Sequence, residues 1–148
     1  MIRLLATALV AAHIPLAAPA QSGGPQAGDP QMTAIRFVIG DTVLSATLDD
    51  TAPARDFASM LPMDLTLSPY HGVEMVGDLG RELDSAGMPG SYEPKTGDIT
   101  QYAPWKNLAI FTAPFSDSRG LVRLGQFDGP IDALTGAGDV TVRIELEN

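Results

Sequence analysis

Residues 33–48 alternate between apolar and polar side chains on both sides of the pair Gly40-Asp41. Alternation with a period of two, interrupted by a Gly-Asp pair, is typical of a β-hairpin with a two-residue turn. The register that gathers the large apolar residues on one face has three pairs: Ile39 with Thr42, Phe37 with Leu44, and Ile35 with Ala46. A shift of one residue would send these side chains to the other face, so the pattern predicts this register and a sheet buried on one side.

Several later segments have the same strand character. The clearest alternation is in residues 139–146, where four apolar side chains face one way: Val140, Val142, Ile144 and Leu146. Five other strands are predicted: Met63–Leu67, Val73–Val76, Ile99–Tyr102, Leu108–Thr112 and Leu121–Gln126. The Gly- and Pro-rich stretch 77–97 is predicted to hold one more short strand near Arg81–Leu83 and a long exposed loop.

Two segments favour short helices. In residues 52–61 four apolar side chains recur at helical spacing: Ala54, Phe57, Ala58 and Leu61. Thr51 can cap the start of this helix, and Pro62 should end it. A second short helix is predicted over Asp128–Leu134. Many short strands without regular strand–helix alternation indicate a mainly β fold, a closed barrel of about eight strands with two short helices over residues 32–148.

The residues before this domain are typical of an export signal and a linker. Arg3, the apolar run 4–12 and Ala18-Pro19-Ala20 follow in the order of a cleavable signal peptide over residues 1–20. The alternative is a buried N-terminal helix. Residues 21–31 are rich in Gly and Pro and lack large apolar side chains, so they are predicted to be a flexible linker. We therefore expect a periplasmic or secreted protein.

Composition limits the partners of the exported domain. The net charge is −9, and loss of Arg3 with the signal peptide would bring it to about −10. Such a surface repels nucleic-acid phosphates and anionic lipid, so neither is an expected partner. The chain has no Cys to carry a lipid or a disulfide, so we expect no stable membrane anchor after cleavage. Roughly 115 residues are enough for a core without disulfides or metal.

Three segments together resemble the bacterial cyclophilin-like proteins, which are small domains of uncharacterised function. These segments are Ala54-Arg55-Asp56-Phe57 with Leu61-Pro62; Gly97-Asp98-Ile99-Thr100-Gln101-Tyr102-Ala103-Pro104-Trp105 with Asn107-Leu108-Ala109-Ile110-Phe111; and Ser118-Arg119-Gly120-Leu121-Val122-Arg123-Leu124-Gly125. The resemblance implies an eight-stranded cyclophilin-type barrel with two helices over roughly residues 32–146.

The resemblance does not imply an activity. Classical prolyl isomerases of the cyclophilin family carry a Phe-His-Arg segment and a Gln-Gly-Gly-Asp-Phe segment, and this chain has neither. The first hypothesis is therefore a non-catalytic binding domain for an unknown peptide or small molecule. The alternatives are a prolyl isomerase with a non-standard site and a barrel that binds a small ligand in an apolar pocket.

No other catalytic or cofactor-binding pattern is present. His71 is the sole imidazole after the signal peptide, so neither a zinc site nor a nucleophile with a histidine base is expected. The acids Asp78, Glu82 and Asp84 could bind calcium weakly, but they lack EF-hand spacing, and a solvated loop is the better account. The Gly-rich stretches match no phosphate-binding fingerprint. We therefore expect no cofactor and no metal.

The remaining candidate site is a group of rings and polar side chains in the two most distinctive segments: Tyr102, Trp105, Asn107, Phe111 and Arg119. Trp105, the only Trp, sits in a predicted turn at the barrel rim, where its ring could form a ligand platform. The alternative is that Trp105 closes the barrel end and Phe111 belongs to the core, because aromatic residues more often pack than bind.

Overall fold

The described part of this computed structural model, residues 31–136 and 138–148, contains ten strands, one α-helix and two 3-10 turns. In chain order the elements are β1 Thr33–Ile39, β2 Thr42–Leu48, α1 Ala52–Ser59, β3 Met63–Tyr70, β4 Glu74–Asp78, β5 Ser91–Tyr92, β6 Asp98–Tyr102, η1 Ala103–Trp105, β7 Asn107–Phe111, β8 Ser118–Arg119, β9 Leu121–Phe127, η2 Asp132–Leu134 and β10 Val140–Leu146. The predicted signal peptide, and the predicted linker up to residue 30, lie outside the described residues.

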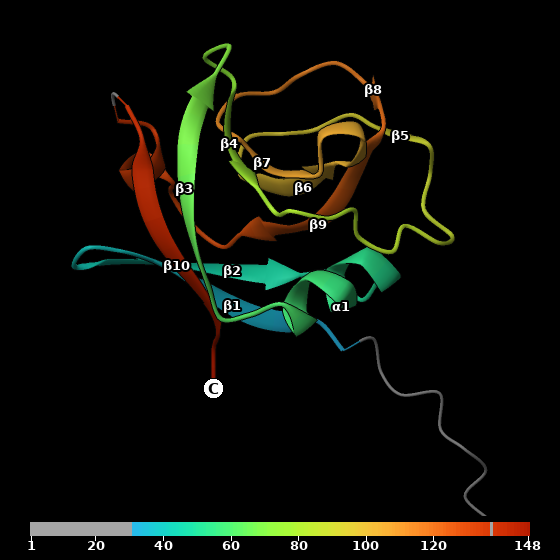
Figure 1. The fold of residues 1–148 in the computed structure, drawn as a ribbon. Helices are drawn as coiled ribbons and strands as arrows, with labels where there is room; N and C mark the ends of the chain where they lie inside the picture. The colour runs from blue at the N-terminus through green and yellow to red at the C-terminus, as the bar shows by residue number, and fades with distance from the viewer. Residues whose placement is uncertain (1–30, 137) are drawn as a thin grey trace, which may run out of the picture.

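Eight of the strands form a closed antiparallel barrel in the order β1-β10-β3-β4-β7-β6-β9-β2 (Figure 1). The barrel closes where β2 meets β9, and Gly125 makes this contact possible. A Cβ atom at Gly125 would lie 2.2 Å from the backbone oxygen of Thr47. The predicted mainly β fold and closed barrel are confirmed. No helix in the described ranges has the length and apolar character needed to cross a membrane.

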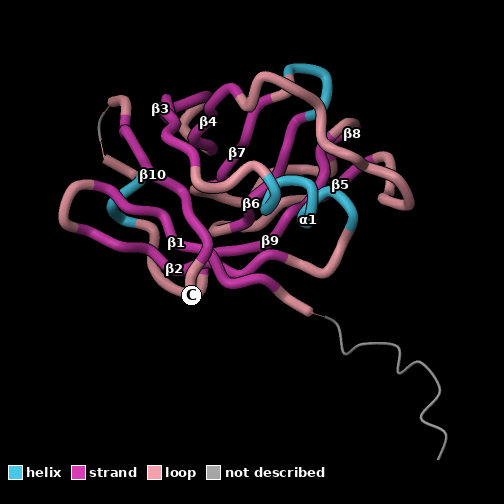
Figure 2. Tube along the Cα trace, turned by 60° about the horizontal axis from the view of Figure 1, so that its bottom comes forward, coloured by secondary structure: helices cyan, strands magenta, loops and turns pink. Residues whose placement is uncertain are grey.

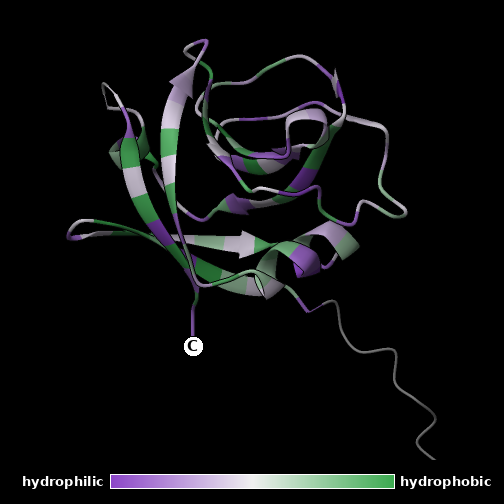
Figure 3. Cartoon of the chain, in the orientation of Figure 1, coloured by the Kyte–Doolittle hydropathy of each residue, from purple (hydrophilic) through white to green (hydrophobic). Residues whose placement is uncertain are grey.

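The barrel interior is built from the alternation seen in the sequence. The hairpin register is as predicted, with Phe37 opposite Leu44 and Ile35 opposite Ala46. Figure 3 shows apolar and polar residues alternating along β3 and β10. The predicted core residues Ile35, Phe37, Phe57, Val142 and Ile144 are fully buried. Two others, Leu44 and Leu61, are only partly buried at the edge of this core, and Leu146 at the end of β10 is exposed.

The single α-helix lies against β9 and supplies Phe57 to the interior core (Figure 2). Thr51 caps it as predicted, accepting a hydrogen bond from the Ala54 backbone N–H at 3.4 Å. The helix ends at Ser59, before Pro62. The second predicted helix, over Asp128–Leu134, is a single 3-10 turn.

The short strand predicted near Arg81–Leu83 does not form, so that prediction was wrong. The backbone there is bound by a side chain instead of by a neighbouring strand. The buried amide of Gln101 accepts from the Leu83 backbone N–H at 2.8 Å and donates to the Arg81 carbonyl at 2.9 Å. One side chain thus satisfies the backbone groups that a strand partner would have satisfied.

A second, smaller apolar cluster lies on the outer face of the barrel. Its buried members are Ala109, Phe111 and Leu121. Residues 112–120, here called the strap, arch over β6 and β7 in Figure 1 and end in β8, which pairs with β5. The strap borders the part of this outer face that holds the candidate site.

Candidate functional site

A groove of about 570 Å³ runs across the outer face of the barrel. Its lining comes from the β3–β4 hairpin, the strands β6 to β9, the turn η1 and the strap. All five residues that the sequence singled out line this groove: Tyr102, Trp105, Asn107, Phe111 and Arg119. The remaining lining residues are Tyr70, His71, Val73, Glu74, Phe115, Ser118 and Leu121.

Strand register explains why residues far apart in the sequence meet here. Residues directly opposite each other on neighbouring strands point to the same face of a sheet. One such row joins Tyr70, Glu74 and Phe111 across β3, β4 and β7. A second row joins Asn107, Tyr102 and Leu121 across β7, β6 and β9. These are the two outward-facing rows that give the groove its side chains.

Aromatic rings form much of the groove surface. The Trp105 ring packs edge-on against Tyr70, with centroids 5.7 Å apart, and against Tyr102 at 5.2 Å. Phe115 of the strap stacks on Phe111 at 6.4 Å. Trp105 is 58% exposed and Phe115 is 47% exposed, so both rings present apolar surface to solvent.

These exposures decide between the two interpretations of the aromatic residues. Trp105 does not close the barrel end, because most of its surface is exposed. Phe111 is buried, with 3% of its surface exposed, but it belongs to the outer-face cluster and not to the interior core. The turn at Ala103–Trp105 is present as expected.

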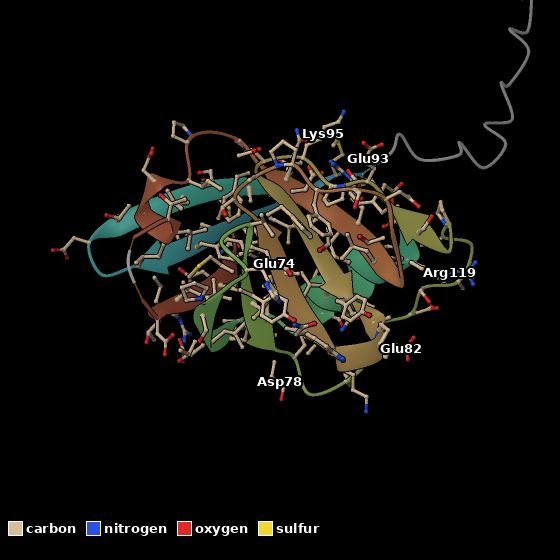
Figure 4. The ribbon with its side chains drawn as sticks, turned by 90° about the horizontal axis from the view of Figure 1, so that it is seen from above. Glu74, Asp78, Glu82, Glu93, Lys95 and Arg119 are labelled. Carbon is tan, nitrogen blue, oxygen red and sulfur yellow. The ribbon has the colours of Figure 1, made fainter. Side chains whose placement is uncertain are left out.

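The groove also contains polar side chains that have no hydrogen-bond or ion-pair partner among the described residues. The side-chain oxygen Oδ1 of Asn107 is buried and accepts no hydrogen bond from the described residues. Burial raises the pKa of Glu74, and the nearby His71 only partly opposes this shift. None of the ion pairs among the described residues includes Glu74 or Arg119. In Figure 4, Glu74 lies near the middle of this face and Arg119 at its side.

Sequence reasoning missed the residues contributed by the β3–β4 hairpin and, from the strap, Phe115 and Ser118. Tyr70 and Glu74 enter the groove only because β4 pairs with both β3 and β7. No local sequence pattern predicts which strands β4 pairs with, so the spacing of residues along the chain could not place Tyr70 and Glu74 in the groove. His71 lies in the hairpin turn with a left-handed backbone (φ of 50°), and its ring packs against Tyr70 at 4.2 Å.

A hydrogen-bond network around Arg123 connects β9 with β5, the strand that pairs with β8 of the strap. Its guanidinium donates to Asp49 Oδ2 at 2.7 Å, to Asp98 Oδ1 at 2.8 Å and to the Tyr92 hydroxyl at 3.0 Å. The Tyr92 hydroxyl donates to Asp98 Oδ2 at 2.6 Å. A smaller cavity of about 220 Å³ lies beside this network. The network fixes β5, and through the β5–β8 pair it positions the strap beside the groove.

Two of the three acids considered as calcium ligands, Asp78 and Asp84, bind the backbone of nearby loop residues instead. Asp78 accepts from the Gly80 backbone N–H at 2.7 Å, and Asp84 accepts from the Ala86 backbone N–H at 3.0 Å. Within residues 31–136 and 138–148, no three His, Cys, Asp or Glu side chains are grouped as metal ligands would be.

Comparison with known proteins places the fold in a family. The chain is similar to the solution structure of a hypothetical protein from Archaeoglobus fulgidus, with 14% sequence identity and a TM-score of 0.59. The match covers 82% of this chain and 99% of the archaeal one, and at this identity it concerns the fold alone. No protein with a curated description matches the sequence. The sequence model of the cyclophilin-like family matches residues 37–145, so the chain belongs to the cyclophilin-like family.

Proposed function

We propose that the outer-face groove binds a short peptide segment, and that the domain is a binding module without classical prolyl isomerase activity. The observation that carries this proposal is the open groove with exposed rings. Large exposed apolar patches bordered by polar groups mark interaction sites. Trp105 and Phe115 are exposed to solvent in the domain, and a bound peptide would bury their apolar surface.

The size and openness of the groove favour a peptide over a compact small molecule. A small-ligand pocket usually buries 70–90% of its ligand, whereas two of the rings here face solvent. Asn107 and the row of Glu74 are separated by four residues along β7, which is about 13 Å of strand. An extended peptide can reach both rows, and its backbone N–H groups could satisfy Asn107 Oδ1.

Prolyl isomerisation demands more than binding. The barrier of about 18–20 kcal/mol falls only when the twisted peptide bond is held more tightly than either planar isomer. The segments that supply the arginine and the apolar wall in classical cyclophilins are absent from this sequence. Arg119 lines the groove, but it lies at the side of the face. We therefore expect weak or no acceleration in a standard proline-peptide assay.

One set of proteins tests this proposal: the wild type, Arg119→Ala and Trp105→Ala. The wild type should show no turnover, and its Trp105 fluorescence should change when peptides are added. Trp105→Ala should bind the same peptides more weakly by calorimetry. Robust wild-type turnover that Arg119→Ala abolishes would replace the binding module with an enzyme. A fluorescence signal that no peptide changes would leave the groove without a role in binding.

We further propose that the protein is exported and cleaved after Ala20. The support is the order of Arg3, the apolar run and the Ala-Pro-Ala site in the sequence. Mass spectrometry of the protein recovered from outside the cytoplasm should give Gln21 as the first residue. An uncleaved chain retained in the cytoplasm would contradict this prediction.

A further inference from the structure

Glu74 is the unusual group in the groove. Its neighbours in register are the aromatic residues Tyr70 and Phe111, and it has no ion-pair partner within the described residues. A carboxylate placed among rings loses part of its hydration, and the charged form becomes less favourable. An ionisable group perturbed by burial in a cleft marks a candidate functional site. The ligand that suits it best is a cation.

We propose that the groove recognises the ammonium group of a lysine side chain in the bound peptide, held by the Glu74 carboxylate among the rings of Tyr70 and Phe111. This inference rests on the proposed peptide-binding function and specifies its ligand. The methylene stem of lysine would cover apolar ring surface. The ammonium would gain an ion pair with Glu74 and the attraction of the half-buried Tyr70 ring for a cation, whereas the buried Phe111 ring would form the apolar floor beside it.

The charges of the domain agree with a cationic ligand. The net charge of −9 attracts basic segments from a distance, which favours their encounter with the groove. Arg119 carries the opposite sign, but Figure 4 places it at the side of the face and Glu74 near its middle. Arg119 can therefore contact a carbonyl or carboxylate elsewhere on the peptide without approaching the ammonium.

The burial of Glu74 gives a control that separates binding from folding. Burial raises the pKa of Glu74, so the folded state binds its proton more tightly than the unfolded state does. This contribution to stability is fully present below the unfolded pKa and is lost as the pH rises through the raised folded pKa. At neutral pH the ionised group opposes folding, so Glu74→Gln should melt at the same or a higher temperature than the wild type.

The experiment compares four capped peptides that differ only at one position: Phe-Ala-X-Ala-Ala, where X is Lys, Gln, norleucine or Glu. They are titrated into the full mature chain at pH 8 by calorimetry and by Trp105 fluorescence. We expect the Lys peptide to bind about tenfold more tightly than the Gln peptide. Glu74→Gln should remove this preference by weakening the Lys peptide, while the norleucine peptide still binds, because an apolar side chain gains nothing from the carboxylate. Glu82→Gln should keep the preference for the Lys peptide, because this variant removes one negative charge from a residue that does not line the groove.

Each outcome has a distinct meaning. Equal affinities for the Lys and Gln peptides, in a protein that binds both, would overturn the lysine inference and leave peptide binding intact. A Lys preference that survives in Glu74→Gln would overturn the role of Glu74. If n-butylammonium binds as tightly as the Lys peptide, the site takes a free small amine, and the peptide assignment is overturned. No response to any peptide would overturn the proposed function itself.

Discussion

Phe37→Ala should lower the free energy of unfolding by about 3–5 kcal/mol, the usual range when a buried aromatic side chain is truncated in a core that cannot collapse. Phe37 has no exposed surface and lies centrally on β1. Its partners in register are Leu44 on β2 and Ile144 on β10, and its ring lies 4.7 Å from that of Phe127. A closed barrel fixes the neighbouring strands by hydrogen bonds, so they cannot move inward to fill the space. Urea denaturation followed by circular dichroism measures the change.

Phe115→Ala is the matched control, because it removes the same atoms from an exposed position on the strap. With 47% of its surface exposed, Phe115 should contribute less than about 1 kcal/mol to stability. The two variants should therefore differ by several-fold in their effect on unfolding. A loss below about 1 kcal/mol for Phe37→Ala would mean that the interior can relax, contrary to the tight packing of a small barrel.

The strands of the barrel were predictable because their signals are local. A period of two in residues 33–48 and a Gly-Asp turn determine the hairpin register, since a shift of one residue would turn Phe37 to the outer face. The barrel closure was inferred from many short strands, with two short helices but without regular strand–helix alternation. The wrong strand prediction at Arg81–Leu83 has a specific cause. The backbone of this loop is bound by the side chain of Gln101, which comes from a distant segment. The local sequence around Leu83 therefore cannot distinguish this loop from a short strand.

The candidate site was predictable only in part, because some of its residues meet through local pairing and others through pairing between distant strands. Tyr102, Trp105, Asn107 and Phe111 lie within one hairpin, β6 to β7, so short-range reasoning could group them. Glu74 reaches the groove through the pairing of β4 with β7, which depends on the whole barrel order. An acidic residue at the start of a short strand has no feature in the sequence that distinguishes it from a solvated one.

The Arg123 network also depends on distant pairing. Arg123 appears in the sequence as one polar residue in an alternating strand, and nothing nearby indicates its partners. Asp49 follows β2, Tyr92 lies in β5 and Asp98 begins β6. Barrel closure brings Asp49 and Asp98 to Arg123 because β9 pairs with both β2 and β6, and Tyr92 joins them because β5 lies against β9 outside the barrel. Its energetic importance follows from burial, which is a property of the folded structure alone.

Arg123→Ala should lower the free energy of unfolding by about 2–4 kcal/mol. Breaking a fully buried ion pair from one side costs about 3–5 kcal/mol, because the remaining charge is left without a partner. Here the Asp98 side chain is 4% exposed, while Arg123 is 24% exposed, and solvent would partly compensate for the loss. Two hydrogen bonds to Asp98 would remain, from the Tyr92 hydroxyl and from the Lys95 backbone N–H. These considerations place the expected cost below the upper end of the range.

Arg143→Ala is the control for this second prediction. Arg143 also pairs with an acid across neighbouring strands, Asp64 at 3.2 Å, but that pair is largely exposed. Exposed pairs contribute about 0–1 kcal/mol, so this variant should unfold close to the wild type. The Arg123 variant should in addition loosen β5 and the strap, which faster amide exchange across the paired residues 91–92 and 118–119 would report. Equal stabilities of the two variants would show that the network is not the support of the groove, and that the strap is held by the outer-face apolar cluster alone.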